Sequence, residues 1–145
     1  MIALIQRVNW AEVKVDGQSV GKIDQGVLAL VAVEKGDTEA SARKMMEKIA
    51  QYRIFSDEQG KMNLSLLDTQ GELLLVSQFT LLANTDKGRR PSFSDSPDPA
   101  MSEALFEYSV RYAKTQVNKV EQGQFAADMK VSLENDGPVT FWLKV

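Results

Sequence analysis

Short alternating stretches fill the first third of the chain and predict β-strands. Residues 2–8 (IALIQRV) are mostly apolar, and residues 11–15 alternate apolar with charged side chains, which is typical of a strand with one buried face. The Asp-Gly pair at 16–17 indicates a turn, after which residues 20–23 return to apolar positions. Residues 27–33 (VLALVAV) form an unbroken apolar run, which predicts a strand buried on both faces.

Two later segments change to the helical period and predict two main helices. The first begins after Asp37 and Thr38, either of which is a good N-cap. The second begins at Asp98-Pro99, where an N-cap precedes a proline at the first helical position. The apolar stripes are Ala42, Met45, Met46, Ile49 and Tyr52 in the first helix, and Met101, Ala104, Leu105, Tyr108 and Tyr112 in the second. We interpret both stripes as core packing.

Between the helices, residues 71–82 (GELLLVSQFTLL) predict a central strand. Two adjacent polar residues, Ser77 and Gln78, interrupt this apolar run. A buried polar side chain without a partner costs about 1 to 3 kcal/mol, so two interpretations stay open. Either these side chains leave the core where the strand ends, or the end of the strand lines a pocket.

The last third of the chain alternates again, over 129–134 and 139–145, on either side of NDGPVT at 135–140. The local interpretation is a hairpin turn, although Pro138 removes a backbone donor directly after Gly137. The alternative starts from the torsion about the Gly-Pro bond. Such a bond can be cis at modest cost, and it would then present two carbonyl oxygens on a rigid tip.

Grouped strands with two helices predict a single α+β domain over residues 1–145, with a mostly antiparallel, barrel-like sheet. A chain of 145 residues is long enough to bury a sizeable core. No run approaches the roughly 20 apolar residues of a membrane helix, and polar residues interrupt the first ten positions too early for a signal peptide. We therefore expect a cytoplasmic protein without a membrane segment.

The amino-acid composition excludes several kinds of catalytic and metal-binding side chain. The chain has no histidine and no cysteine, which excludes structural zinc sites, histidine triads and Cys-His dyads. The formal net charge of −3 argues against broad nonspecific binding to nucleic acid. Lys87, Arg89 and Arg90 nevertheless form one basic cluster, which is either a solvated loop or a contact for phosphates.

Several motifs, in their order and spacing, resemble those of the D-aminoacyl-tRNA deacylase family, once called D-Tyr-tRNA(Tyr) deacylases. They are LIQRV near the start, YRIFSDEQGKMN at 52–63, SQFTL at 77–81, RRPSF at 89–93 and FAADMKVSLENDGPVTFWL at 125–143. The resemblance extends over nearly the whole chain. It implies hydrolysis of the ester between a D-amino acid and the terminal adenosine of a tRNA, with glycine also accepted, as proofreading in translation.

The resemblance also implies a homodimer in which each subunit completes the site of the other. Gly137 and Pro138, joined by a cis bond in the family, would enter the partner's pocket beside Ser77, Gln78, Phe79 and Thr80. A chiral filter made of fixed carbonyl oxygens rejects an L-residue by collision at its Cβ. The expected partners are therefore aminoacylated tRNA and a second copy of the chain.

Three further residues match positions with a role in the family. Arg7 resembles the arginine that donates hydrogen bonds to the Gly-Pro tip, and the alternative is an exposed charge on an edge strand. Phe125 and Met129 match positions that line the adenosine pocket, where an aromatic ring stacks on an unpaired base. We expect neither a cofactor nor a metal.

The catalytic mechanism leaves alternatives. Backbone N–H groups around Phe79 and Thr80 are candidate donors to an oxyanion, with the adenosine 2′-hydroxyl organising the water. Thr80 as a nucleophile is less favoured, because a hydroxyl needs an adjacent base and the chain has no histidine. A non-enzymatic module that binds the tRNA end is a rival hypothesis. A metal-dependent esterase is disfavoured, since no tight carboxylate cluster appears in the sequence.

Overall fold

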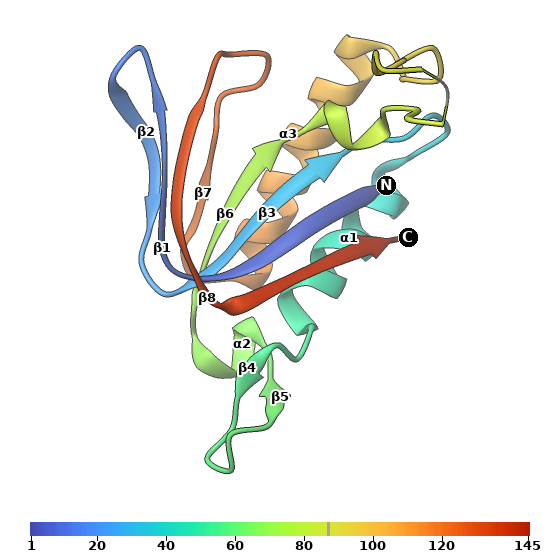
Figure 1. Ribbon diagram of the computed structural model, residues 1–145. Helices are drawn as coiled ribbons and strands as arrows, with labels where there is room; N and C mark the ends of the chain where they lie inside the picture. Colours follow the sequence, from blue (N-terminus) through green and yellow to red (C-terminus); the bar gives the residue numbers. More distant parts are fainter. Residues whose placement is uncertain (87) are drawn as a thin grey trace.

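One strongly curved β-sheet, with two long helices on one of its faces, forms the body of the protein (Figure 1). The computed structural model describes residues 1–86 and 88–145. The strands of the large sheet are β1 (Ile2–Val15), β2 (Gln18–Ile23), β3 (Gly26–Ala32), β6 (Glu72–Ser77), β7 (Val120–Gln122) and β8 (Lys130–Lys144). The remaining elements are α1 (Glu39–Gln51), β4 (Phe55–Ser56), β5 (Met62–Leu64), α2 (Leu66–Thr69), the 3₁₀ turn η1 (Phe79–Leu82) and α3 (Pro99–Gln116).

Strand β1 organises the sheet, because it pairs antiparallel with β2, β3 and β8. Its first half pairs with β3 and its second half with β2, whereas β8 follows its other edge for almost the whole length. The sheet curves until β2 meets β7: a Cβ added to Gly21 would lie 2.6 Å from the carbonyl oxygen of Gln122. The predicted barrel-like α+β architecture is confirmed.

The pairs β3–β6 and β6–β7 are parallel, so the sheet is mixed. The chain leaves β3 through α1 and leaves β6 through α3, and a crossover through a helix brings the next strand back in the same direction. The sequence predicted the two helices. It did not lead us to expect that strands joined through these helices would pair in parallel.

Two apolar cores lie on the two faces of the sheet. The larger core packs α1 and α3 against the sheet through residues such as Met45, Ile49, Phe106, Ile5 and Leu75. The smaller core fills the inside of the curve and includes Val8, Ile23, Leu28 and Leu74. Alternate residues of one strand therefore point into different cores, as the unbroken apolar run of β3 predicted.

The helix starts agree with the predicted caps. Thr38 precedes α1, and its N–H donates to Ser41 Oγ at 3.2 Å. Asp98 precedes α3 and accepts a hydrogen bond from the N–H of Met101 at 3.2 Å. The short helix α2 was not predicted; in it the N-cap Ser65 accepts from the N–H of Asp68 at 3.1 Å. No helix in the described parts of the chain is long and apolar enough to cross a bilayer.

The central strand is shorter than its apolar pattern predicted. β6 ends at Ser77, and residues 79–82 turn into η1, where the N–H of Leu81 donates to the carbonyl oxygen of Gln78 at 3.2 Å. Leu81 and Leu82 are half-buried in this turn. The apolar alternation continues through the turn because these side chains still pack against the protein, so the pattern alone did not mark the end of the strand.

The predicted hairpin at NDGPVT is wrong. The segments on either side of it do not pair with each other: residues 130–135 pair with β1 at Val8–Lys14, and residues 140–144 pair with β1 at Ile2–Gln6. Between them the register shifts, and residues 136–139 bulge out of the strand. We call residues 136–139 the Gly-Pro tip. The bond between Gly137 and Pro138 is cis, and both residues are exposed.

Candidate active site

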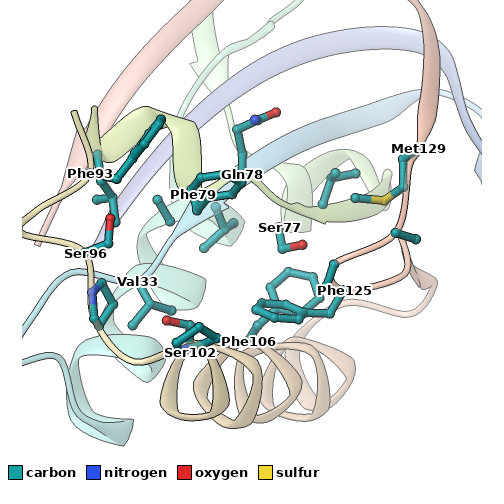
Figure 2. Close-up of a pocket in the computed structure, with 18 of the residues that line it drawn as sticks. Val33, Ser77, Gln78, Phe79, Phe93, Ser96, Ser102, Phe106, Phe125 and Met129 are labelled. Atoms are coloured by element: carbon teal, nitrogen blue, oxygen red, sulfur yellow. The ribbon is translucent and has the colours of Figure 1, made fainter. Parts of the chain in front are cut away.

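A cavity of about 620 Å³ opens where the parallel strands β3 and β6 end (Figure 2). Its walls also include η1, the segment before α3, the first turns of α3 and the loop that leads to β8. In sheets with helical crossovers, ligand sites lie at the carboxyl ends of parallel strands. The cavity occupies such a position in this fold.

The polar residues that interrupt the central strand lie at the cavity wall. Ser77 and Gln78 both line it, and Figure 2 shows the Ser77 side chain directed into the cavity. The N–H of Gln78 donates to the carbonyl oxygen of Val31 at 2.8 Å, which continues the pairing of β6 with β3 by one more bond. Both interpretations left open by the sequence agree with the structure: β6 ends at Ser77, the Gln78 amide bonds to Thr80 on the exposed surface, and the end of the strand lines a cavity.

Aromatic rings from distant parts of the chain form much of the cavity. The rings of Phe106 in α3 and Phe125 lie 6.2 Å apart between centroids, and those of Phe79 and Phe93 lie 5.1 Å apart. Met129 adds a thioether to the same cavity. Aromatic rings and a flexible thioether suit a flat apolar group such as a nucleobase.

Backbone amides at the start of η1 are available as donors. None of the hydrogen bonds found in the described chain is donated by the N–H groups of Phe79 and Thr80. The first amides of a helical turn have no partner inside the turn. Thr80 itself is exposed and does not line the cavity; its hydroxyl accepts a hydrogen bond from Gln78 Nε2.

Few charges face the cavity. Asp128 is the one charged residue among its described lining residues, and its carboxylate lies 2.8 Å from Lys130 Nζ on an exposed surface. In residues 1–86 and 88–145, no group of three acidic side chains could hold a metal ion. The arrangement therefore offers hydroxyls and main-chain dipoles for chemistry rather than a buried acid or base.

Arg7 contacts the Gly-Pro tip from β1. Its Nε donates to the carbonyl oxygen of Asp136 at 3.0 Å and lies 3.2 Å from the Asp136 carboxylate, and one terminal nitrogen donates to the carbonyl oxygen of Ile54 at 2.7 Å. The side chain is only 12% exposed, and β1 lies between other strands. The alternative of an exposed charge on an edge strand is therefore wrong.

The tip does not reach the cavity of its own chain. None of residues 136–139 is among the lining residues in the described structure. Of the predicted site residues, Ser77, Gln78, Phe79, Phe125 and Met129 share one cavity, whereas Thr80 lies beside it. Arg7, Gly137 and Pro138 form a separate group around the tip.

The predicted basic cluster lies in the loop between η1 and α3. Main-chain hydrogen bonds of 2.9 and 3.3 Å join Asn84 to Ser92 and close this loop. Arg89 and Arg90 are exposed on it, and Lys87 lies outside the described residues. Phe93 follows directly and packs on Phe79, so the loop is attached to the cavity wall.

Sequence reasoning missed several lining residues. Phe93, Ser96, Ser102 and Phe106 all line the cavity. Ser102 and Phe106 are four residues apart on one face of α3, and that spacing could have suggested a shared surface. The Ser96 hydroxyl is buried and has no hydrogen-bond partner among the described residues, which no local sequence signal indicates.

The nearly closed mixed sheet, backed by two helices, defines a small α+β protein with an aromatic-lined cavity where its parallel strands end. The comparisons with known proteins are more specific. The family model for D-Tyr-tRNA(Tyr) deacylase matches residues 4–144, and the chain belongs to this family.

Similar proteins cover the chain from end to end. A protein from Actinobacillus pleuropneumoniae serotype 5b (strain L20) named D-aminoacyl-tRNA deacylase is 58% identical over 145 residues, which is all of both chains. A protein of the same name from Haemophilus influenzae (strain 86-028NP) is 57% identical, again over the full length of both. A solved structure titled c-Myc DNA Unwinding Element Binding Protein has a TM-score of 0.94 and 34% identity, covering 100% of this chain and 99% of that one.

Proposed function

We propose that the protein hydrolyses the ester bond of D-aminoacyl-tRNA, releasing the D-amino acid and free tRNA. The observation that carries the proposal is the match of the whole chain, at 56–58% identity, to proteins named D-aminoacyl-tRNA deacylase. Such a reaction would remove D-residues before they enter translation, and the protein would act in the cytoplasm, where its substrate is used.

The cavity would take the terminal adenosine of the tRNA. Phe125 and Met129 line it together with Phe106, and stacking on an aromatic ring is a common way to hold an unpaired base. A base bound there brings the ester to the end of β6, near Ser77 and the free amides of η1. The largely apolar walls support this assignment, because the one charge among their described residues, on Asp128, lies on the exposed surface beside Lys130.

The Gly-Pro tip of a second copy would act as the chiral filter. The tip is exposed and lies outside the cavity of its own chain, so its carbonyl oxygens are free to meet a ligand held by another subunit. Fixed main-chain atoms reject an L-aminoacyl group by collision at its Cβ, whereas a D-residue directs its side chain away. Glycine has no Cβ, so glycyl-tRNA, including glycine mischarged on tRNA(Ala), would pass the same filter.

The chemistry would depend on main-chain donors and on the substrate. The N–H groups of Phe79 and Thr80 would stabilise the oxyanion that forms when water attacks the ester carbonyl, a role worth about 3 to 4 kcal/mol per donor. Ser77 and Gln78 would border the reacting group. The adenosine 2′-hydroxyl, next to the ester, would organise the attacking water, because the chain has no imidazole to do so.

The loop that carries Arg89 and Arg90 would contact phosphates of the acceptor stem, with Lys87 in the same segment of the sequence. Its attachment to the cavity wall through Phe93 and Phe79 supports this proposal, since a stem bound on the loop would lie next to the bound adenosine. An acidic protein would in this way handle tRNA through one local basic surface.

The test is stereoselective deacylation. Purified protein is incubated with D-Tyr-tRNA and, separately, with L-Tyr-tRNA, and the released amino acid is measured over time. We expect rapid release of D-tyrosine and far slower release of L-tyrosine. Equal release of both, or none, would remove the proposed function.

Two controls separate the rival classes of protein. A module that binds the tRNA end without hydrolysis would shift tRNA in a gel but would not accelerate release. A metal-dependent esterase would lose activity after exhaustive chelation and regain it with a divalent ion. We expect full activity after chelation.

A further inference from the structure

The Gly-Pro tip is held by hydrogen bonds on two sides, from Arg7 on one side and from Asn135 on the other. Asn135 is the last residue before the bulge in β8 that still pairs with β1. Its side chain accepts a hydrogen bond from the N–H of Val139 at 2.7 Å and donates to the carbonyl oxygen of Val139 at 3.1 Å. The same amide nitrogen lies 3.1 Å from Thr140 Oγ1.

These bonds replace a strand partner. The pairing with β1 passes from Gln6–Thr140 directly to Val8–Asn135, so Val139 has no register partner on β1. Val139 is only 5% exposed, and buried main-chain groups need partners. The Asn135 amide offers one acceptor and one donor to a single residue, which is the exchange that a neighbouring strand residue makes in an antiparallel ladder.

A second side chain fixes the orientation of the amide. Thr140 Oγ1 accepts from Asn135 Nδ2 and also lies 3.3 Å from Gln6 Nε2 of β1. The amide plane is therefore held at both of its ends. Similar side chains could not make the same set of bonds. Aspartate lacks the donor, glutamine is longer by one carbon, and serine has no planar pair of donor and acceptor groups.

We infer that Asn135 is a positioning residue for the chiral filter: its side chain sets the direction of the Gly137 and Pro138 carbonyl oxygens by holding the second half of the tip. Arg7 holds the first half through the carbonyl oxygen of Asp136, so the two exposed residues lie between two fixed ends. This inference rests on the proposed function. In it, Asn135 acts on the filter without contacting the substrate.

The test compares Asn135→Ala with a matched control, Asn9→Ala. Asn9 is also an asparagine, in β1 at the register shift between Val8 and Trp10, but its Nδ2 donates to Glu134 Oε1 at 2.6 Å rather than to the tip. For each variant, kcat/KM is measured with D-Tyr-tRNA and L-Tyr-tRNA. The ratio of the two values does not depend on how much of the sample is folded, so it reports the filter rather than stability.

We expect Asn135→Ala to lower the D-over-L ratio by about tenfold or more, because small displacements of positioning groups have large effects on reaction rates, and Asn9→Ala to leave the ratio unchanged. Asn135→Asp keeps the acceptor for Val139 and loses the donor, so its ratio should lie between wild type and Asn135→Ala. This second variant serves if the alanine protein does not fold.

One result would overturn the inference: the D-over-L ratio stays at the wild-type value in both Asn135 variants. If the activity with both substrates then falls by the same factor, the role of Asn135 is purely structural. Failure of the proposed function is a different outcome, since wild-type protein would then show no preference for D-Tyr-tRNA in the first place.

Discussion

The Thr80 hydroxyl lies on the exposed surface of η1 and accepts a hydrogen bond from Gln78. No histidine, cysteine or lysine is in contact with it among the described hydrogen bonds, so nothing nearby is suited to remove its proton. The N–H of the same residue donates no hydrogen bond found among the described residues. The hydroxyl and the backbone N–H of Thr80 can therefore be tested separately, because a side-chain substitution removes the hydroxyl and leaves the N–H in place.

Thr80→Ala should lower kcat by about five- to tenfold, the equivalent of one ordinary hydrogen bond of about 1 kcal/mol. The backbone N–H, and with it the proposed oxyanion contact, is unchanged by this substitution. Single-turnover kinetics with D-Tyr-tRNA measure the effect. Removing a true nucleophile costs on the order of a million-fold, so a loss of that size, or an acyl group trapped on Thr80, would contradict the water mechanism.

At the scale of elements, Glu72 joins three parts of the sheet at the start of β6. Its Oε2 accepts from Lys119 Nζ and from the N–H of Asp24, each at 2.8 Å. Partial burial raises the pKa of Glu72, but the hydrogen bonds from Lys119 and Asp24 lower it by more, so the pKa lies below its ordinary value of 4.5. The carboxylate thus stabilises the folded protein through its charged form.

The sign of the pH effect follows from this lowered pKa. The stabilisation from Glu72 is fully present above pH 4.5 and is lost as the pH falls through the folded-state pKa. Glu72→Gln should therefore lower Tm at pH 7, by the equivalent of about 1 kcal/mol or less for a partly exposed pair. Thermal unfolding followed from pH 7 down to pH 3 should show this difference shrinking below pH 4.5. A difference that grows on acidification would contradict the assignment.

Element boundaries show what the sequence alone determines. Caps at Thr38 and Asp98 placed the helix starts correctly, because capping depends on neighbouring residues only. The end of β6 and the bulge in β8 were misassigned, since apolar alternation is the same in a strand, in a packed 3₁₀ turn and across a bulge. Whether Asn135 begins a hairpin depends on whether the segments before and after it pair with each other or with a third strand. Here both pair with β1, which lies more than a hundred residues away in the chain.

At the scale of the molecule, the cavity joins segments that local patterns cannot bring together. Ser77, Phe106 and Phe125 meet because β3, β6 and β7 are parallel neighbours and α3 crosses behind them. The resemblance of motifs grouped Ser77 with Phe125 before the fold was known. It did not include Phe106 or Ser102, because helical residues on a cavity wall have the same pattern as residues that pack in the core.

The separation of the tip from its own cavity predicts complementation between subunits. Gly137→Ala damages the tip, because the added Cβ would lie 2.5 Å from the backbone nitrogen of Val139. Phe125→Ala damages the cavity. Each protein alone should be nearly inactive toward D-Tyr-tRNA. In the proposed homodimer, mixing and exchange of subunits makes half of the dimers mixed, each with one intact site, so about a quarter of wild-type activity should return.

The activity of the mixture is compared with the sum of the two variants measured separately, and size-exclusion chromatography checks that subunits have exchanged. A mixture no more active than that sum, despite exchange, would show that each chain uses its own tip.

The bulge in β8 has an evolutionary consequence. The ladder on either side of it is fixed independently, by Ile2–Gln6 with 140–144 and by Val8–Lys14 with 130–135. Replacements of the exposed Gly137 and Pro138 leave both registers intact, whereas Val139 is buried and belongs to the core. The proposed determinant of stereochemical preference is thus confined to two exposed residues, which mutation can change without altering how β8 pairs with β1.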